Sequence, residues 1–246
     1  MNKTVLITGA SGGIGKALCK QFAKEGCNVV IHYFSSEEKA QALKAELEST
    51  YNIKAITFKA DMRDSQQIKS FAEAALKEFG SIDVLINNAG VAYFSLFQLS
   101  DDRKVADLFD INLMSAMTLT KEILPSMINK HRGRIINISS MWGISGASCE
   151  VHYSASKAAL IGFTKALAKE VGPSGITVNC IAPGFIDTEM NSCLDEESVK
   201  EIVDATPMGR KGTGDDVASL AVYLSKDEAG FITGQTISVD GGFLGN

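Results

Sequence analysis

Three side chains that could handle a proton stand close together in the second half of the sequence. Tyr153 and Lys157 are four residues apart. Because an α-helix has about 3.6 residues per turn, their side chains would share one helix face. The apolar run Ile135–Ile138 would deliver Ser139 and Ser140 to the end of a strand. A phenol, an ammonium and a hydroxyl in one place predict a site of proton transfer.

Alternating strands and helices are needed to position these residues. Apolar runs predict strands at Val5–Ile7, Asn28–Tyr33, Lys54–Lys59, Val84–Ile86, Arg134–Ile138, Ile176–Ile181 and Thr236–Val239. Helical periodicity predicts helices from Ile14 to Gly26, Ser36–Thr50, Asp64–Phe79, Asp101–Lys130, Tyr153–Val171, Asp195–Ala205 and Asp215–Ser225. The alternation predicts an α/β fold, a doubly wound parallel sheet of about seven strands with helices on both faces.

Polar residues and glycines follow several of the predicted strands. Gly9, Asp61, Asn88 and Ser140 each come shortly after a strand end. In sheets of this kind ligands bind beyond the carboxyl ends of the strands, where these residues would meet. The sequence therefore predicts one binding site along that edge.

The first of these features is the glycine-rich segment Thr8–Gly15 between a strand and a helix. Glycines there allow a pyrophosphate to approach backbone N–H groups at the helix N-terminus, so the segment predicts a dinucleotide site. A tight strand-to-helix turn without a ligand is the alternative.

Composition excludes several other functions. The chain has 246 residues, 45% of them hydrophobic, and a net charge of -5, which argues against nucleic-acid binding. No apolar run is long enough to span a bilayer and no secretory segment is evident, so we expect a cytoplasmic protein without a membrane partner. The five cysteines are odd in number and lack Cys-x-x-Cys spacing, which predicts neither a disulfide framework nor a metal site.

Taken in order, the motifs resemble the short-chain dehydrogenases/reductases. They are Thr8–Gly15, Asn87–Gly90, Asn112, Ser140, Tyr153-x-x-x-Lys157 and Pro183-Gly184. The resemblance covers nearly the whole chain and implies one Rossmann-fold domain over residues 1–246. In it, residues 1–90 would mainly bind cofactor and residues 91–246 would carry catalysis and substrate binding, with a lid at 190–206.

The resemblance also implies catalytic roles. Tyr153 would give a proton to the alkoxide that forms when a ketone accepts hydride. Lys157 would hold the nicotinamide ribose and bring the tyrosine pKa toward neutrality. Ser140 would bind the substrate oxygen, with Trp142 nearby, and Asn112 would anchor a water in the proton path.

The cofactor would contact a larger set of residues. By resemblance these are Gly9, Ala10, Ser11, Gly12, Gly13, Ile14, Gly15, Phe34, Ser35, Asp61, Met62, Asn88, Ala89, Gly90, Tyr153, Lys157, Pro183, Gly184, Ile186 and Thr188.

Each catalytic residue also has an ordinary structural interpretation. Tyr153 could be a packed aromatic, Lys157 a solvated helix residue and Ser140 a turn former. For the site to have no catalytic role, all three of these interpretations would have to be correct at once. Ser139 competes with Ser140, although the family spacing favours Ser140. A non-catalytic dinucleotide sensor would typically have lost Tyr153 or Lys157, and both are present.

The choice of cofactor depends on the end of the second strand. No acidic residue occurs there until Glu37, so nothing would repel a 2′-phosphate and NADP is favoured over NAD. Gly12 stands where many NADP-using relatives carry a basic residue. His32, Ser35 and Ser36 are the remaining candidates to hold the phosphate.

The chain is most similar to the 3-oxoacyl-acyl-carrier-protein reductases, and two other substrate classes are alternatives. The C-terminal Gly234–Thr236 and Asp240–Gly242 segments are similar to those of 3-oxoacyl-acyl-carrier-protein reductases of fatty-acid synthesis. The segments Trp142-Gly143 and Ala147–Tyr153 resemble reductases of 5-aminopentanone-modified elongation factor P, in which Glu150 would meet an amine unless it is only an exposed loop acid. The mostly apolar Tyr93–Phe97 segment would also tolerate a hydroxysteroid or sugar-alcohol substrate.

A carrier protein would need basic residues to grip it. The relatives tend to have them near the positions of His131 and Ser174, and here only Lys130, Arg132 and Arg134 are nearby. The resemblance further implies a homotetramer, with the small residues of the Tyr153 helix in one interface.

Overall fold

The computed structural model describes residues 3–191 and 195–245. A seven-stranded parallel sheet has the order β3-β2-β1-β4-β5-β6-β7. Its strands are β1 (Thr4–Ile7), β2 (Asn28–Tyr33), β3 (Ala55–Lys59), β4 (Val84–Asn87), β5 (Gly133–Ile138), β6 (Ile176–Pro183) and β7 (Thr236–Val239). This order confirms the doubly wound Rossmann-type fold that the alternation predicted.

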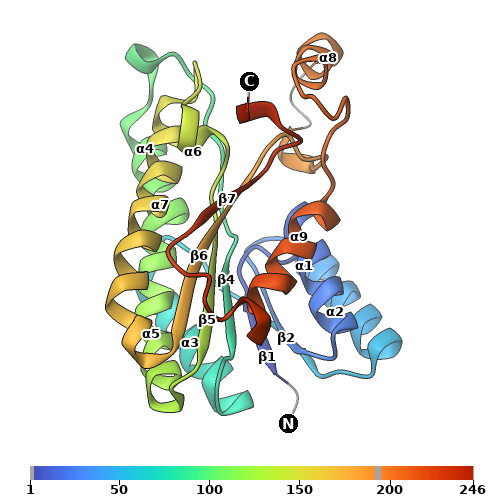
Figure 1. Cartoon of the computed structure of the whole chain (residues 1–246), viewed down its shortest axis with the longest axis vertical. Helices are drawn as coiled ribbons and strands as arrows, with labels where there is room; N and C mark the ends of the chain where they lie inside the picture. The colour runs from blue at the N-terminus through green and yellow to red at the C-terminus, as the bar shows by residue number, and fades with distance from the viewer. Residues whose placement is uncertain (1–2, 192–194, 246) are drawn as a thin grey trace.

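Helices cover both faces of the sheet. They are α1 (Gly13–Lys24), α2 (Glu37–Tyr51), α3 (Ser65–Phe79), α4 (Asp102–Phe109), α5 (Ser115–Lys130), α6 (Trp142–Ser145), α7 (Val151–Val171), α8 (Glu196–Asp204) and α9 (Gly214–Ser225). Figure 1 shows α3, α5 and α7 on one side of the sheet and α1, α2 and α9 on the other. No helix within the described ranges is long and apolar enough to cross a bilayer.

The apolar core forms on both faces because side chains alternate along each strand. Val5 and Ile7 pack with Phe22 on the face covered by α1 and α9. Leu6 points the other way and packs with Phe71 of α3. Burial of each such side chain contributes about 1.5–3 kcal/mol, so the core holds the strand ends in fixed relative positions.

The helical segment predicted over Asp101–Lys130 is confirmed, since α4, a π-helical turn and α5 follow one another from Asp102 to Lys130. The π-helical turn is η2 (Asp110–Met114), which the sequence did not indicate. The extra residue per turn of a π segment changes which side chains face inward. The helix predicted to begin at Tyr153 begins two residues earlier, at Val151.

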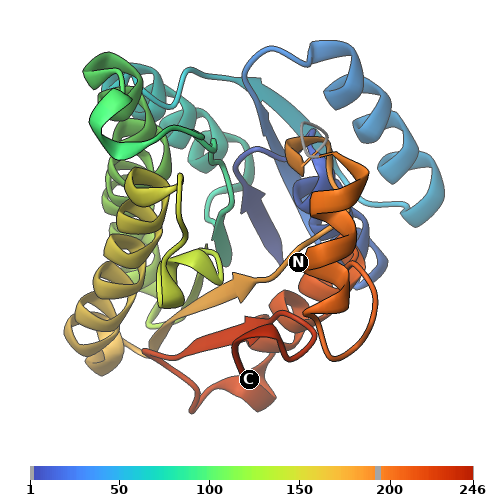
Figure 2. The ribbon, with the colours of Figure 1, turned by 90° about the horizontal axis from the view of Figure 1, so that it is seen from above.

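All seven strands run in the same direction, so their carboxyl ends lie along one edge of the sheet. Figure 1 places α8 above that edge, and Figure 2 looks down on it. The turn after β1 and the turn after β4 are neighbours there, because β1 pairs with both β2 and β4. The sheet order reverses at this point, which in such folds is where a ligand binds.

Candidate active site

The two serines after β5 have different surroundings. The Ser139 hydroxyl donates a hydrogen bond to the backbone oxygen of Lys157 across 2.9 Å and is buried. The Ser140 hydroxyl accepts one from the backbone N–H of Trp142 at 3.2 Å and also hydrogen-bonds the Tyr153 hydroxyl. The geometry therefore favours Ser140, as the sequence spacing did, because Ser139 is used in holding α7 against the strand.

Tyr153 lies on the first turns of α7 and is only 8% exposed. Burial raises the pKa of its phenol to about 12, since a buried phenolate is poorly solvated; the hydrogen bond with Ser140 acts in the opposite direction, and the charge of Glu150 raises the pKa further. At neutral pH the phenol carries its proton.

Lys157 is also buried, one helical turn after Tyr153. Its Nζ donates a hydrogen bond to the backbone oxygen of Ile138 at 2.9 Å and lies 5.7 Å from the centre of the tyrosine ring. Burial lowers the pKa of this ammonium to about 8. The expectation that Lys157 brings the pKa of Tyr153 toward neutrality is not met in this structure. The ammonium is directed to a backbone carbonyl, and desolvation of the phenol dominates.

Asn112 sits in the middle of the π-helical turn and is 1% exposed. Its Oδ1 accepts a hydrogen bond from the backbone N–H of Val91 at 2.8 Å, and its Nδ2 donates to the Val91 backbone oxygen and to the Ser156 hydroxyl. The irregular turn thus directs this amide into the protein, against the loop after β4 and against α7.

Gly90 connects the loop after β4 to these residues. A Cβ built on Gly90 would lie 3.1 Å from Lys157 Nζ and 3.2 Å from Asn112 Oδ1. Both polar atoms therefore approach the same point of the backbone, and a larger residue would push them away. The structure brings Asn112, Ser140, Tyr153 and Lys157 to one place, as the sequence predicted.

The glycine-rich turn packs too tightly for side chains. A Cβ on Gly15 would lie 2.2 Å from the backbone oxygen of Gly9, and Gly9 itself has a φ of +61°. Four helices have side-chain caps, from Asp64, Asp101, Asp195 and Thr213, whereas α1 begins after Gly12 with no side-chain cap and no acidic residue in its first turn. Open N–H groups at a helix N-terminus suit an anion, and this cradle fits a dinucleotide diphosphate.

The turn after β4 is tied to the glycine-rich turn. The Thr8 hydroxyl accepts hydrogen bonds from the backbone N–H groups of Asn88 and Ala89, each at 2.9 Å. In return the Asn88 amide donates to the backbone oxygens of Thr8 and Gly9. The predicted residues Asn88, Ala89 and Gly90 thereby form one wall of the groove.

His32 does not face the groove, which corrects its place among the candidates for a 2′-phosphate. The ring is 2% exposed and both its nitrogens contact backbone atoms of Gly9 and Ala60, at 3.0 and 3.1 Å. Burial lowers its pKa to about 4, so the ring is neutral at physiological pH. A ring with both nitrogens engaged and no exposed surface cannot bind a phosphate.

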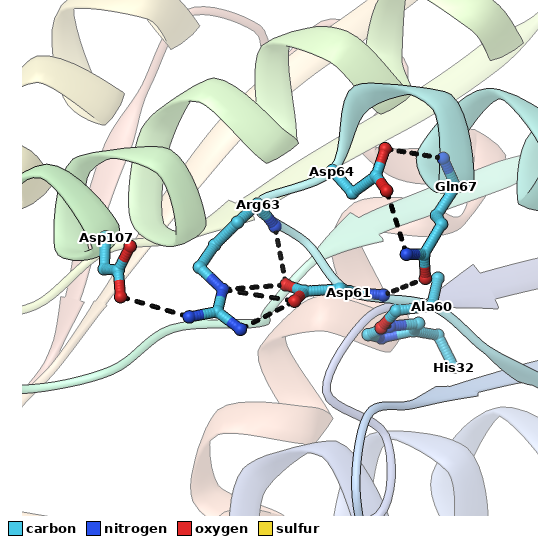
Figure 3. A network of polar contacts seen from close by, with 7 residues as sticks. All are labelled: His32, Ala60, Asp61, Arg63, Asp64, Gln67 and Asp107. Atoms are coloured by element: carbon cyan, nitrogen blue, oxygen red, sulfur yellow. Dashed lines mark hydrogen bonds and ion pairs between the residues drawn. The ribbon is translucent and has the colours of Figure 1, made fainter.

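Arg63 is a residue that the sequence reasoning missed. Figure 3 shows its guanidinium between the carboxylates of Asp61 and Asp107, with contacts of 2.7 and 3.1 Å. The guanidinium carbon also lies 5.7 Å from the ring centre of Phe34, which is half exposed. The Arg63 side chain, by its hydrogen bonds, holds the pKa of the Asp61 carboxyl below its usual range. An arginine two positions after a predicted cofactor residue was the available signal.

A groove and a cavity meet at Tyr153. The groove is lined by Gly9, Gly12, Gly13, Ile14, Gly15, Asn88, Ala89, Gly90, Ile138, Ser139, Tyr153, Lys157, Thr188 and Glu189. The cavity, of about 590 Å³, is bounded by the loop after β5, α7 and α8. Of these two, the cavity alone is lined by Ser140, Trp142, Pro183, Gly184 and Ile186, and both are lined by Ile14, Ser139, Tyr153 and Thr188. Ala10, Ser11, Phe34, Ser35, Asp61 and Met62 are predicted cofactor residues that line neither.

The segment predicted as a lid borders the cavity. Asn191, Glu201 and Ile202 line it, and residues 192–194 of the prediction lie outside the described residues. Before this segment, Glu189 pairs with Lys39 of α2 at 2.6 Å, and Thr188 packs against Gly13. The segment therefore reaches from the cavity to the groove.

No cluster that could hold a metal ion is found among the described His, Cys, Asp and Glu residues. Cys19, Cys27, Cys149 and Cys180 are free thiols, and Cys193 lies outside the described residues.

Comparison with known proteins gives similarities along nearly the whole chain. A family model described as short chain dehydrogenase matches residues 3–198. The chain is 38% identical over 242 residues to the 3-oxoacyl-acyl-carrier-protein reductase FabG of Staphylococcus aureus strain N315, covering 98% of each chain. It is 38% identical over 243 residues, 99% of each chain, to the protein named uncharacterized oxidoreductase YmfI of Bacillus subtilis strain 168. These matches span the groove, the cavity and the sheet that connects them.

Proposed function

This chain belongs to the short-chain dehydrogenase family, and from that premise we propose that it reduces a ketone to a secondary alcohol with NADPH. The observation that carries the proposal is the position of Tyr153 between the groove and the cavity. A proton donor at that boundary can serve a carbonyl in the cavity while a nicotinamide lies in the groove. When bound, the nicotinamide supplies a hydride to the carbonyl carbon.

The residues of this chain would then complete the reaction. The carbonyl oxygen becomes an alkoxide as its carbon accepts the hydride, and the Tyr153 phenol transfers its proton to that oxygen. A phenol that is protonated at neutral pH suits this role as an acid. The Ser140 hydroxyl, which hydrogen-bonds the Tyr153 hydroxyl, is placed to donate to the same oxygen as charge develops.

Lys157 and Asn112 would support the proton donor. The lysine pKa of about 8 allows it to hold or release a proton near neutral pH. Both side chains approach Gly90, which lines the groove, so they are placed between the cofactor and the interior. We assign Lys157 to the nicotinamide ribose and to returning a proton to the phenolate, and Asn112 to the path that supplies it.

For the cofactor we propose NADPH over NADH. The exposed residues that follow β2, Phe34 and Ser35, are uncharged, so no carboxylate directly after the strand would repel a 2′-phosphate. The Arg63 guanidinium lies over the Phe34 ring, and we propose Arg63 in place of His32 as a candidate to bind the 2′-phosphate. Ser35 and Ser36 remain the hydroxyl candidates.

Two substrate classes follow from the comparisons and the cavity. A 3-oxoacyl thioester, as in fatty-acid synthesis, is suggested by the name of the Staphylococcus aureus relative. Binding of an acidic carrier protein by the basic residues at this end of the fold has little support. Arg132 and Arg134 pair with Asp227, and Lys130 contacts Ser81. An aminoketone, such as the 5-aminopentanone group of a modified protein, is the second candidate, and buried Glu150 in the cavity favours it.

We also propose a homotetramer. Ala155, Ala158 and Gly162 are exposed along one side of α7, and no heavy atom lies within 4 Å of a Cβ built on Gly162. Exposed Met114 and Met117 lie on the neighbouring helical segments. Light scattering that gave a monomer would contradict this assembly. A cytoplasmic location and a single domain over residues 1–246 stay predictions.

The test of the function is a substrate and cofactor matrix. Purified protein is given NADPH or NADH with an acetoacetyl thioester, a steroid ketone and an aminopentanone-modified protein, and absorbance of the reduced nicotinamide is followed. We expect NADPH to be consumed with at least one ketone and the matching alcohol to form. The proposal fails if no ketone is reduced with either cofactor while the protein still binds them.

A further inference from the structure

We propose that Glu150 determines the substrate by pairing with a protonated amine carried by the ketone. The inference rests on the proposed ketone reduction and narrows it to one substrate class. Glu150 would be a specificity residue at the cavity, distinct from the proton donor and the cofactor groove.

Glu150 is largely buried, and its carboxylate has no partner among the described residues. The residue is 9% exposed, and it immediately precedes α7 as its N-cap. Its backbone groups are bonded to Ala147 and Ser154, but within the described ranges its side chain makes no hydrogen bond or ion pair and does not cap the helix. An unpaired carboxylate at the wall of a cavity is less well solvated than one in bulk water, so a cation beside it would stabilise its ionised form.

Glu150 lines the same cavity as the proposed proton donor. Glu150 lines the cavity together with Ser140, Trp142 and Tyr153. Glu150 precedes Tyr153 by three residues at the start of α7, and its charge raises the pKa of the Tyr153 phenol. A substrate whose carbonyl oxygen reaches Tyr153 therefore brings its neighbouring atoms to Glu150.

The other charged residues that line the cavity also favour a cationic substrate. Among the described residues that line it, Glu150 and Glu201 carry negative charge, and none is a lysine, an arginine or a histidine. A cation in the cavity would meet complementary charge on more than one wall.

Occupation by a cation would also help the chemistry. Burial raises the pKa of the Glu150 carboxyl, since its ionised form lacks solvation. An ammonium beside it would stabilise the ionised form and form a charge-assisted hydrogen bond. Pairing would also reduce the repulsion that the carboxylate exerts on a developing Tyr153 phenolate.

A matched pair of ketones tests the inference. The probes are 4-aminobutan-2-one, which is protonated at neutral pH, and pentan-2-one, in which a methyl group replaces the ammonium. We expect wild-type protein with NADPH to favour the aminoketone in kcat/KM by about 10- to 100-fold, mainly through KM, as expected for a hydrogen bond to a charged group. In Glu150→Gln the ratio of kcat/KM for the aminoketone to kcat/KM for pentan-2-one should fall to about one.

Glu170→Gln removes the same charge from the exposed end of α7 and should keep the wild-type preference. Equal use of the two ketones by wild-type protein would overturn the role of Glu150 but leave ketone reduction standing. An unchanged preference in Glu150→Gln would overturn it as well. If neither probe nor any ketone of the larger panel is reduced, the proposed function itself has failed. Circular dichroism and NADPH binding by Glu150→Gln show whether the variant is folded.

Discussion

The imidazole of His32 holds the glycine-rich turn in place by accepting a hydrogen bond at Nδ1 from the backbone N–H of Gly9, across 3.0 Å. Because that N–H can only donate, Nδ1 is the unprotonated nitrogen and Nε2 carries the hydrogen that reaches the Ala60 oxygen. One neutral ring therefore connects the turn after β1 with the end of β3. Protonation of Nδ1 would place a second N–H donor opposite the backbone N–H of Gly9.

This relationship predicts a pH-dependent stability. The pKa of His32 is about 4 in the folded protein against 6.5 for the free side chain, so the unfolded chain binds more protons between these values. Stability is therefore lost as pH falls through that window. Relative to His32→Asn, wild-type protein should lose about 2 kcal/mol of unfolding free energy between pH 7 and pH 5. Denaturant titrations at the two pH values check this, and parallel curves would contradict it.

Tyr153→Phe removes the proposed proton donor and little else. We expect kcat for ketone reduction to fall by about 10²- to 10⁴-fold, the usual contribution of a general acid. NADPH affinity, followed by fluorescence titration, should stay within a few-fold of wild type. Undiminished turnover in this variant would rule out the assigned mechanism.

The neighbouring serines provide an internal comparison. Ser140→Ala should reduce kcat, because its hydroxyl contacts that of Tyr153. Ser139→Ala should leave kcat nearly unchanged but lower the unfolding free energy by about 1 kcal/mol, through loss of the bond to the Lys157 carbonyl. Kinetics and denaturation of both variants check this assignment of the two serines. A loss of kcat in Ser139→Ala but not in Ser140→Ala would reverse it.

Gly15→Ala tests the cradle of the glycine-rich turn. The added methyl would lie 2.2 Å from the Gly9 oxygen, so the backbone must move. We expect NADPH affinity to fall at least about tenfold and stability by about 1–3 kcal/mol. Gly172→Ala is the control, since a Cβ there meets no atom within 4 Å. Calorimetric titration with NADPH measures the affinity of both variants. Equal affinities would show that the turn does not hold the cofactor.

Buried Lys157 should make the free energy of unfolding depend on pH. Its pKa of about 8 lies below the ordinary value of 10.5, so the unfolded chain binds more protons between these values and stability rises with pH there. Relative to Lys157→Met, wild-type protein should gain about 2 kcal/mol between pH 8 and pH 10. Unfolding free energies of the two proteins, taken across this range, decide the matter. A constant difference would mean that the lysine titrates normally.

Much of the fold and of the site follows from the sequence alone. The strand-helix alternation predicted the parallel sheet, and the residues that follow its strands predicted the edge where the site lies. The spacing of Tyr153 and Lys157 placed both on α7, because helix periodicity is a local property. The glycine-rich turn after β1 was equally readable, since the backbone there needs residues without side chains.

Tertiary structure decided what each of these residues touches. Only packing shows that Ser139 is engaged by α7, that a π-helical turn buries Asn112, and that Lys157 binds a backbone carbonyl. His32 was one of three candidates to hold a phosphate, and its ring is enclosed by backbone. Glu150, which could have been an exposed loop acid, is largely buried and lines the cavity. The physical reason is that solvation and partners depend on segments distant in the chain, whereas spacing and propensity report only on neighbours.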